Sequence, residues 1–193
     1  MSCPFDAVSR EVPERGRILE IGCGYALFSA HLAMTSPNRD VVGVDISSEK
    51  IVVAREVAHR FAISEGRRFE VRLTAPGEVP AGPWDAIVIV DVLYLMPPRE
   101  ERALLEAAAR ELSPGGRLII KEMNDEPRWK VAFNRFQESL AVHVFRFTTG
   151  QGLHFIPPAE ITRWLESAGL SLASSRRLDH HSLHPHHLLV FQK

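Results

Sequence analysis

Two acidic residues flank a glycine-rich turn in the first quarter of the chain. Glu20 stands two residues before Gly22, and Asp45 follows Gly24 by 21 residues. A glycine turn ahead of a helix lets a ligand approach the backbone, where free N–H groups attract negative charge. A carboxylate at the end of the next strand can accept hydrogen bonds from both hydroxyls of a ribose. The spacing favours an adenosine site; the alternatives are an ordinary tight corner and, for Asp45, a helix N-cap.

Glu20 narrows the choice of adenosine compound. A dinucleotide would place its pyrophosphate at the turn, where a nearby acid would repel it. S-adenosylmethionine has no phosphate, and its sulfonium and ammonium groups favour neighbouring carboxylates. The alternative for Glu20 is a partnership with a buried arginine or with backbone amides. The third small position holds Ala26, and Leu27 stands where a dinucleotide fingerprint would have its last glycine.

The elements that would position these residues alternate along the chain between short apolar runs and helical patterns. We expect strands near 17–21, 41–45, 68–73, 84–90, 116–122, 170–178 and 187–192, and helices near 24–35, 47–63 and 98–112, with one more in PPAEITRWLESAGL. Such alternation favours a parallel sheet with helices on both faces. The last two runs lie too close together for a parallel crossover, so the last strand should be antiparallel. The predicted fold is α/β: one doubly wound, mostly parallel, Rossmann-like seven-stranded domain.

Composition bounds the environment and the partners. The chain has 193 residues, a net charge of -1 and two cysteines without metal-type pairing. Lysines and arginines are scattered, so we expect no nucleic-acid partner. No apolar run approaches the roughly 20 residues that a transmembrane helix needs. We therefore expect a cytoplasmic, soluble protein with no metal site, and leave peripheral membrane contact and a homodimer open.

Four motifs in order carry a resemblance to a known family. ILEIGCGYA, VVGVDIS, WDAIVIVDVLYLMP and LSPGGRLII resemble the motifs of class I S-adenosylmethionine-dependent methyltransferases over residues 17 to 123. The resemblance implies S-adenosyl-L-methionine as cofactor, with the methionine part surrounded by Glu20, Gly22, Cys23 and Gly24, the ribose held by Asp45, the adenine packed on Ile46, and the rest lined by Thr74, Ala75, Val90 and Asp91. Many members carry an acid after the third strand, where this chain offers only Thr74.

Methyl transfer from a sulfonium requires mainly that the acceptor is held in line with the methyl group and that water is excluded. A base is needed only where the acceptor must lose a proton. The candidates are Asp91, Tyr94 and Glu122, followed by Asp125, His143 and His154. Asp91 serves equally well as a structural or cofactor contact. The family's amino-methylating signature, an Asp or Asn followed by two prolines and an aromatic, is absent after the fourth strand, which disfavours methylation of nucleic-acid bases.

A helical insertion is expected at about 124–157, with an aromatic-rich helix near 127–147 that caps the substrate site. It is interpreted as a lid or dimer helix, or as a surface for an apolar or lipid-like acceptor met at a membrane. The stretch HHSLHPHH, residues 180–187, reads as a solvated hairpin turn rather than a metal site. The function expected is methyl transfer from S-adenosylmethionine to a small acceptor. The alternatives are a protein that binds the cofactor without catalysis and a nucleotide-linked oxidoreductase.

Overall fold

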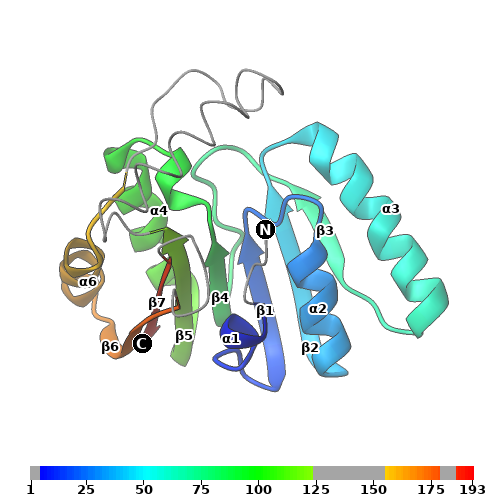
Figure 1. The fold of residues 1–193 in the computed structure, drawn as a ribbon, viewed down its shortest axis with the longest axis horizontal. Coiled ribbons are helices and arrows are strands. Elements are labelled where there is room, and N and C mark those ends of the chain that lie inside the picture. The colour runs from blue at the N-terminus through cyan, green and yellow to red at the C-terminus, as the bar shows by residue number, and fades with distance from the viewer. Residues whose placement is uncertain (1–4, 124–154, 179–185) are drawn as a thin grey trace.

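A computed structural model describes residues 5–123, 155–178 and 186–193 of the chain. Within them, seven strands form one sheet in the order β3-β2-β1-β4-β5-β7-β6 (Figure 1). The strands are β1 (Arg15–Ile21), β2 (Asn38–Asp45), β3 (Glu70–Leu73), β4 (Trp84–Val90), β5 (Leu112–Met123), β6 (Ser171–Arg177) and β7 (His186–Gln192). The helices are α1 (Phe5–Ser9), α2 (Leu27–Thr35), α3 (Ser48–Glu65), the 3-10 helix η1 (Leu93–Leu95), α4 (Pro98–Glu111) and α6 (Pro158–Ser167). The predicted α/β, Rossmann-like architecture is confirmed.

Strand directions also agree with the prediction. β1 runs parallel to β2 and β4, β2 to β3, and β4 to β5. β7 is antiparallel to both of its neighbours, β5 and β6. The carboxyl ends of the parallel strands consequently meet at one edge of the sheet, which is where open α/β sheets bind ligands.

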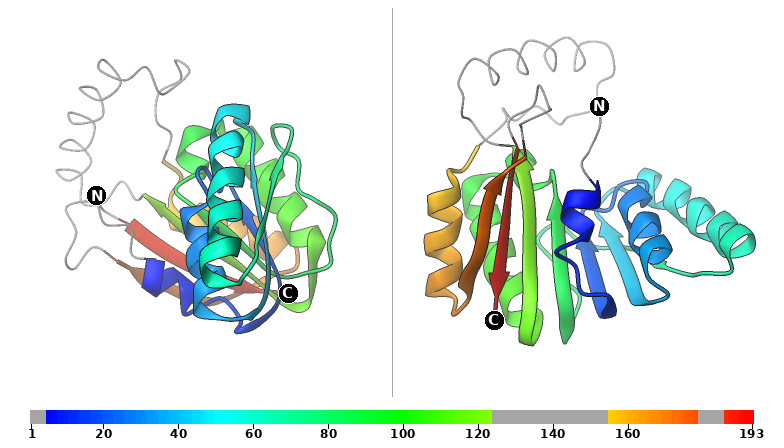
Figure 2. Two further views of the ribbon diagram at one scale, coloured as in Figure 1. Left: turned by 90° about the vertical axis from the view of Figure 1, so that its right-hand side faces the viewer. Right: turned by 60° about the horizontal axis from the view of Figure 1, so that its bottom comes forward.

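Helices cover both faces of the sheet (Figure 2). Helices α1, α2 and α3 pack on the face that contains Ile18, and α4 and α6 pack on the face that contains Leu19. Successive side chains of a strand point to opposite faces. Because β1 and β4 are covered on both faces, side chains on both sides of these strands are buried, and the strands are continuous apolar runs rather than alternating ones.

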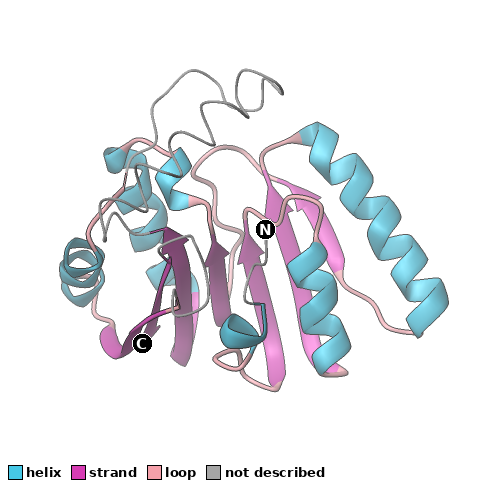
Figure 3. Ribbon diagram, in the orientation of Figure 1, coloured by secondary structure: helices cyan, strands magenta, loops and turns pink. Residues whose placement is uncertain are grey.

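Two elements, α2 and β5, begin three to four residues away from their expected positions. Helix α2 begins at Leu27, three residues after Gly24, because Gly24 and Ala26 have left-handed backbones with φ of 55° and 61°. Ala26 is thus an alanine in a glycine-like conformation. Strand β5 begins at Leu112, and its register against β4 shifts across the Pro-Gly-Gly segment. Residues 74–83 connect β3 to β4 as a loop without a helix (Figure 3).

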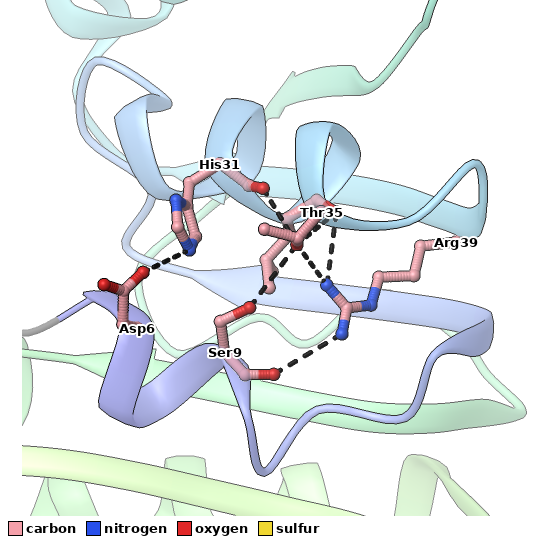
Figure 4. A network of polar contacts seen from close by, with 6 residues as sticks. Asp6, Ser9, His31, Thr35 and Arg39 are labelled. Atoms are coloured by element: carbon pink, nitrogen blue, oxygen red, sulfur yellow. Dashed lines mark hydrogen bonds and ion pairs between the residues drawn. The ribbon is translucent and has the colours of Figure 1, made fainter.

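A polar network fixes the short helix α1, which periodicity did not predict, to α2 and β2 (Figure 4). The buried guanidinium of Arg39 donates to Thr35 Oγ1 at 2.6 Å and to the carbonyl oxygen of Ser9 at 3.4 Å. Burial lowers the pKa of Arg39 from its usual value. Asp6 Oδ1 lies 3.6 Å from His31 Nε2 on α2. The N-terminal segment is therefore held against the helix that follows the glycine turn.

Parts of the expectation fall outside the described residues: the helix near 127–147, Asp125, His143, His154 and positions 180–185 of the histidine-rich stretch. Across the described ranges, no helix is both long and apolar enough to cross a membrane.

Candidate active site

The glycine turn is fastened to the end of β2. The N–H groups of Gly22 and Cys23 both donate to the carbonyl oxygen of Val44, at 2.8 and 2.9 Å. The next N–H, of Gly24, donates to Asp45 Oδ2 at 2.8 Å. The turn and the carboxylate, which lie far apart in the sequence, are therefore neighbours at the carboxyl edge of the sheet.

The two glycines of the turn have different reasons to be glycine. Both have left-handed backbones, with φ of 76° at Gly22 and 55° at Gly24. A Cβ on Gly22 would overlap Cγ2 of Val92, the residue that precedes η1, whereas a Cβ on Gly24 would meet no atom within 4 Å. Gly22 is thus needed for packing, and Gly24 leaves open space beside the backbone, as close approach of a ligand requires.

The carboxylate of Asp45 is buried and oriented by two backbone groups. Its Oδ1 accepts a hydrogen bond of 2.8 Å from Ser47 N, and its Oδ2 accepts the bond from Gly24. Ser47 is the N-cap of α3, since its hydroxyl accepts from Lys50 N at 3.3 Å. Helix capping is therefore assigned to Ser47. A carboxylate oxygen has two lone pairs, so each oxygen of Asp45 can accept one more hydrogen bond.

Glu20 lies on the same face of the sheet as Asp45, the face that α2 covers. Its buried carboxylate accepts hydrogen bonds from the hydroxyl and from the backbone N–H of Ser29. The backbone-amide alternative for Glu20 is therefore borne out in part, and its side-chain partner is a serine hydroxyl. Burial, with a smaller contribution from Asp45, raises the pKa of Glu20 to about 7. Gly43, in β2, lies opposite Glu20 of β1 in the sheet. A Cβ on Gly43 would lie 2.7 Å from the hydroxyl oxygen of Ser29. Sequence patterns gave no indication of Ser29 or Gly43.

Cys23 lies close enough to Glu20 and Asp45 for both of their charges to act on its thiol. Burial raises the pKa of its thiol, and the charges of Glu20 and Asp45 raise it further. The thiol therefore stays protonated, and its contribution to the site is its shape and apolar surface.

Apolar side chains are exposed beside Asp45. Ile46 is 62% exposed and Leu73, at the end of β3, is 50% exposed. The N–H of Thr74 donates to the carbonyl oxygen of Asp45 at 3.1 Å, which brings Thr74 and Ala75 next to the end of β2. Ile46, Thr74 and Ala75 are the residues that the family resemblance implied for the part of the site around the adenine.

A second polar group lies at the carboxyl ends of β4 and β5. Asp91 has a left-handed backbone with φ of 57°, unusual for a residue other than glycine. One of its oxygens pairs with the ammonium of Lys121, which is fully buried in β5. The other oxygen lies 3.7 Å from Nδ1 of His186, a buried residue of β7. A strained residue at a strand end, held by a buried charge, is a common mark of a functional site.

His186 and His187 correct the interpretation of the histidine-rich stretch. We expected a solvated turn over residues 180–187 and a strand from residue 187, but β7 already begins at His186, and His187 is bonded to the Ser175 hydroxyl at 2.8 Å. Both histidines are therefore part of the sheet. Neither Lys121 nor His186 was among the expected site residues.

Glu122 points to the opposite face of β5 from Lys121. Its Oε1 accepts hydrogen bonds from Val92 N and Leu93 N, both at 2.9 Å, and so fixes the start of η1. Burial, assisted by the nearby charge of Asp91, raises the pKa of Glu122 to about 8. Tyr94, in η1, stacks on Phe155 with ring centroids 6.1 Å apart.

Comparison with known proteins identifies the family. A family model described as a methyltransferase domain matches residues 4–175. The chain belongs to the class I S-adenosylmethionine-dependent methyltransferases. Among its relatives is a ubiquinone biosynthesis O-methyltransferase from Xylella fastidiosa (strain 9a5c), 35% identical over 171 residues that cover 87% of this chain. The chain spans 66% of the length of that relative, slightly less than two thirds.

Solved structures share the methyltransferase fold. The magnesium protoporphyrin IX methyltransferase of Synechocystis PCC 6803, solved with bound SAH, superposes with a TM-score of 0.77 at 19% identity, covering 98% of this chain and 81% of that one. A SAM-dependent methyltransferase from Methanosarcina mazei gives a TM-score of 0.77 at 20% identity, covering 100% and 98% of the two chains.

The methyltransferase thus has two groups of candidate residues at one edge of its sheet. Glu20, the glycine turn, Asp45, Ile46, Thr74 and Ala75 lie around the ends of β1, β2 and β3. Val90, Asp91, Tyr94 and Glu122 lie around the ends of β4 and β5. Val92 joins the groups, because its side chain packs on Gly22 and its N–H is bonded to Glu122.

Proposed function

We propose that this methyltransferase transfers the methyl group of S-adenosylmethionine to a hydroxyl oxygen of a small acceptor. The observation that carries the proposal is the pairing of Gly24 with Asp45: open space over a glycine backbone, next to an oriented carboxylate with lone pairs to spare. The name of the Xylella relative, an O-methyltransferase, supports oxygen as the methylated atom.

The residues around Asp45 fit the proposed cofactor. Asp45 would hold the ribose hydroxyls, the exposed side chain of Ile46 would cover the adenine, and Thr74 and Ala75 would lie at the adenine edge. Glu20, Gly22, Cys23 and Gly24 would surround the methionine part, where a carboxylate suits a cationic ligand. When bound, S-adenosylmethionine supplies a methyl group already activated on a sulfonium.

On the acceptor side, the chain orients the hydroxyl and excludes water. In this proposal, Val90 and Asp91 lie between cofactor and acceptor, with Lys121 keeping the Asp91 carboxylate in one orientation. Glu122 and Tyr94 complete the acceptor side and, with Asp91, are the candidates for contact with its hydroxyl. We further place the enzyme in the cytoplasm, with a small-molecule acceptor and no nucleic-acid partner.

The test is transfer of label from methyl-tritiated S-adenosylmethionine into a panel of small hydroxylated compounds and an apolar metabolite extract. We expect label in a small-molecule product, with less than about a tenth of that label for Asp45→Ala, since hydrogen bonds to a charged group are at stake. Binding of the cofactor without transfer to any compound would contradict the proposal and favour a non-catalytic binding protein.

A further inference from the structure

A pocket lies next to the 3-10 helix η1, on the face of the sheet that α4 and α6 cover. Its apolar walls include Leu93, Met123 and Ile156, and its polar groups are Glu101, Glu122 and Tyr94. Glu101 comes from α4 and Glu122 from the end of β5. We refer to this space as the acid pocket.

Glu122 presents an unused oxygen to the acid pocket. The residue is 7% exposed, and its Oε1 is occupied by the two backbone N–H groups of η1. Its Oε2 is buried and has no hydrogen-bond partner among the described residues. A buried polar atom without a partner is costly. A ligand oxygen in the pocket would satisfy it.

Glu101 adds a second acid whose side chain is fully buried. Burial, with a contribution from Glu160, raises the pKa of Glu101 to about 8, close to that of Glu122. At neutral pH both acids are therefore mostly uncharged, and an uncharged carboxyl group both donates and accepts hydrogen bonds. An uncharged oxygen substituent fits such a pocket, whereas an ion would have to be desolvated among apolar walls.

The acid pocket adjoins the methyl-transfer site. Val92 packs on Gly22 at the cofactor side and donates its N–H to Glu122 at the pocket side. Tyr94, stacked on Phe155, contributes an aromatic wall. An acceptor ring beside η1 could therefore direct one substituent to the cofactor and another into the pocket.

We propose that the acid pocket binds a second, uncharged oxygen substituent of the acceptor, a hydroxyl or a carbonyl, through Glu101 and Glu122, and so selects acceptors that carry two oxygens. The inference rests on the proposed function, because it assumes that the acceptor is methylated on oxygen.

The experiment compares catechol with phenol as acceptors of labelled methyl. We expect the wild-type kcat/KM to favour catechol by about tenfold or more, as one hydrogen bond allows. Glu101→Leu and Glu122→Ala should bring that preference down to about twofold, the statistical factor for two equivalent hydroxyls. Glu122→Gln, whose amide oxygen can still accept the N–H groups of η1, should restore most of it. Glu100→Gln, an exposed acid on α4, should match the wild type.

A purely structural role of the two acids would slow both acceptors equally and leave the ratio unchanged, which would overturn the inference. Preference for 3-hydroxybenzylamine over catechol would also overturn it, because the pocket would then bind a cation. Label transfer without a catechol preference contradicts this inference alone. Absence of both cofactor binding and label transfer contradicts the proposed function.

A binding measurement on the wild type tests the same inference if neither catechol nor phenol is methylated, or if a Glu101 or Glu122 variant does not fold. In wild-type protein saturated with S-adenosylhomocysteine and labelled with ¹³C at the glutamate carboxyls, catechol should shift the Glu122 and Glu101 resonances more than phenol does. Equal responses, or none, would overturn the inference.

Discussion

The backbone N–H of Gly24 donates a 2.8 Å hydrogen bond to the carboxylate of Asp45. The bond joins the turn after β1 to the end of β2. A second backbone group, Ser47 N, holds the other carboxylate oxygen at the same distance. The side chain is thereby fixed before any ligand arrives, which reduces the ordering cost of binding.

The two glycines of the turn should respond differently to alanine. Gly24→Ala should cost about 1 kcal/mol of stability, the penalty of a left-handed alanine, and should weaken binding of S-adenosylhomocysteine because the methyl group enters the open space. Gly22→Ala should cost about 3 kcal/mol, because overlap with Val92 adds to the backbone strain. Urea unfolding and calorimetric titration of both variants check this. Equal stability losses would contradict the division of roles.

Asp45→Asn should weaken binding of S-adenosylhomocysteine by about 10- to 100-fold, because the amide can no longer accept hydrogen bonds at both of its ends. Asp40→Asn is the matched control on β2: its side chain is 70% exposed and lies 3.9 Å from Arg17. Calorimetry on the two variants should show the loss only at position 45. A comparable loss at Asp40 would point to a general effect of charge.

Lys121→Met should cost about 3 kcal/mol of stability, because it leaves the Asp91 carboxylate without its buried partner. The double variant with Asp91→Asn should lose less than the two single variants together, with a coupling of about 2 kcal/mol, since neither charge then remains. Urea unfolding of the wild type, the two single variants and the double variant gives the four free energies of this double-mutant cycle. Additive losses would show that the pair does not act as a unit.

The raised pKa of Glu122 makes stability depend on pH. Between its ordinary value of 4.5 and its folded value of about 8, the unfolded chain has released the proton that the folded chain keeps, so stability falls as the pH rises. The Glu122→Gln variant has no carboxyl group to titrate at this position, so it lacks this pH-dependent loss of stability. Its stability relative to wild type should rise by about 3 to 4 kcal/mol between pH 5 and pH 8. Urea unfolding across that range checks the slope, with Glu100→Gln as the flat control.

The sequence was informative where a pattern is local. Alternating runs predicted the sheet, the short last connection predicted its antiparallel strand, and Asp45 at the end of VVGVD was expected next to the glycine turn. Each of these follows from spacing along the chain.

Contacts between distant segments could not be predicted in the same way. The Lys121–Asp91 pair joins neighbouring strands through side chains 30 residues apart. Its one signal was a lysine inside the apolar run RLIIKEM, since a buried lysine requires a partner. The burial of His186 depended on where β7 begins, and strand boundaries are the least certain part of a sequence prediction. The five-residue helix α1 is too short to show a helical period.

Calorimetric titration of the wild-type chain with S-adenosylmethionine, S-adenosylhomocysteine and NAD tests the central claim most directly. We expect one molecule of either adenosyl compound to bind per chain, and no heat of binding from NAD, whose pyrophosphate would meet the acid of Glu20. Binding of NAD without binding of S-adenosylmethionine or S-adenosylhomocysteine would contradict the account.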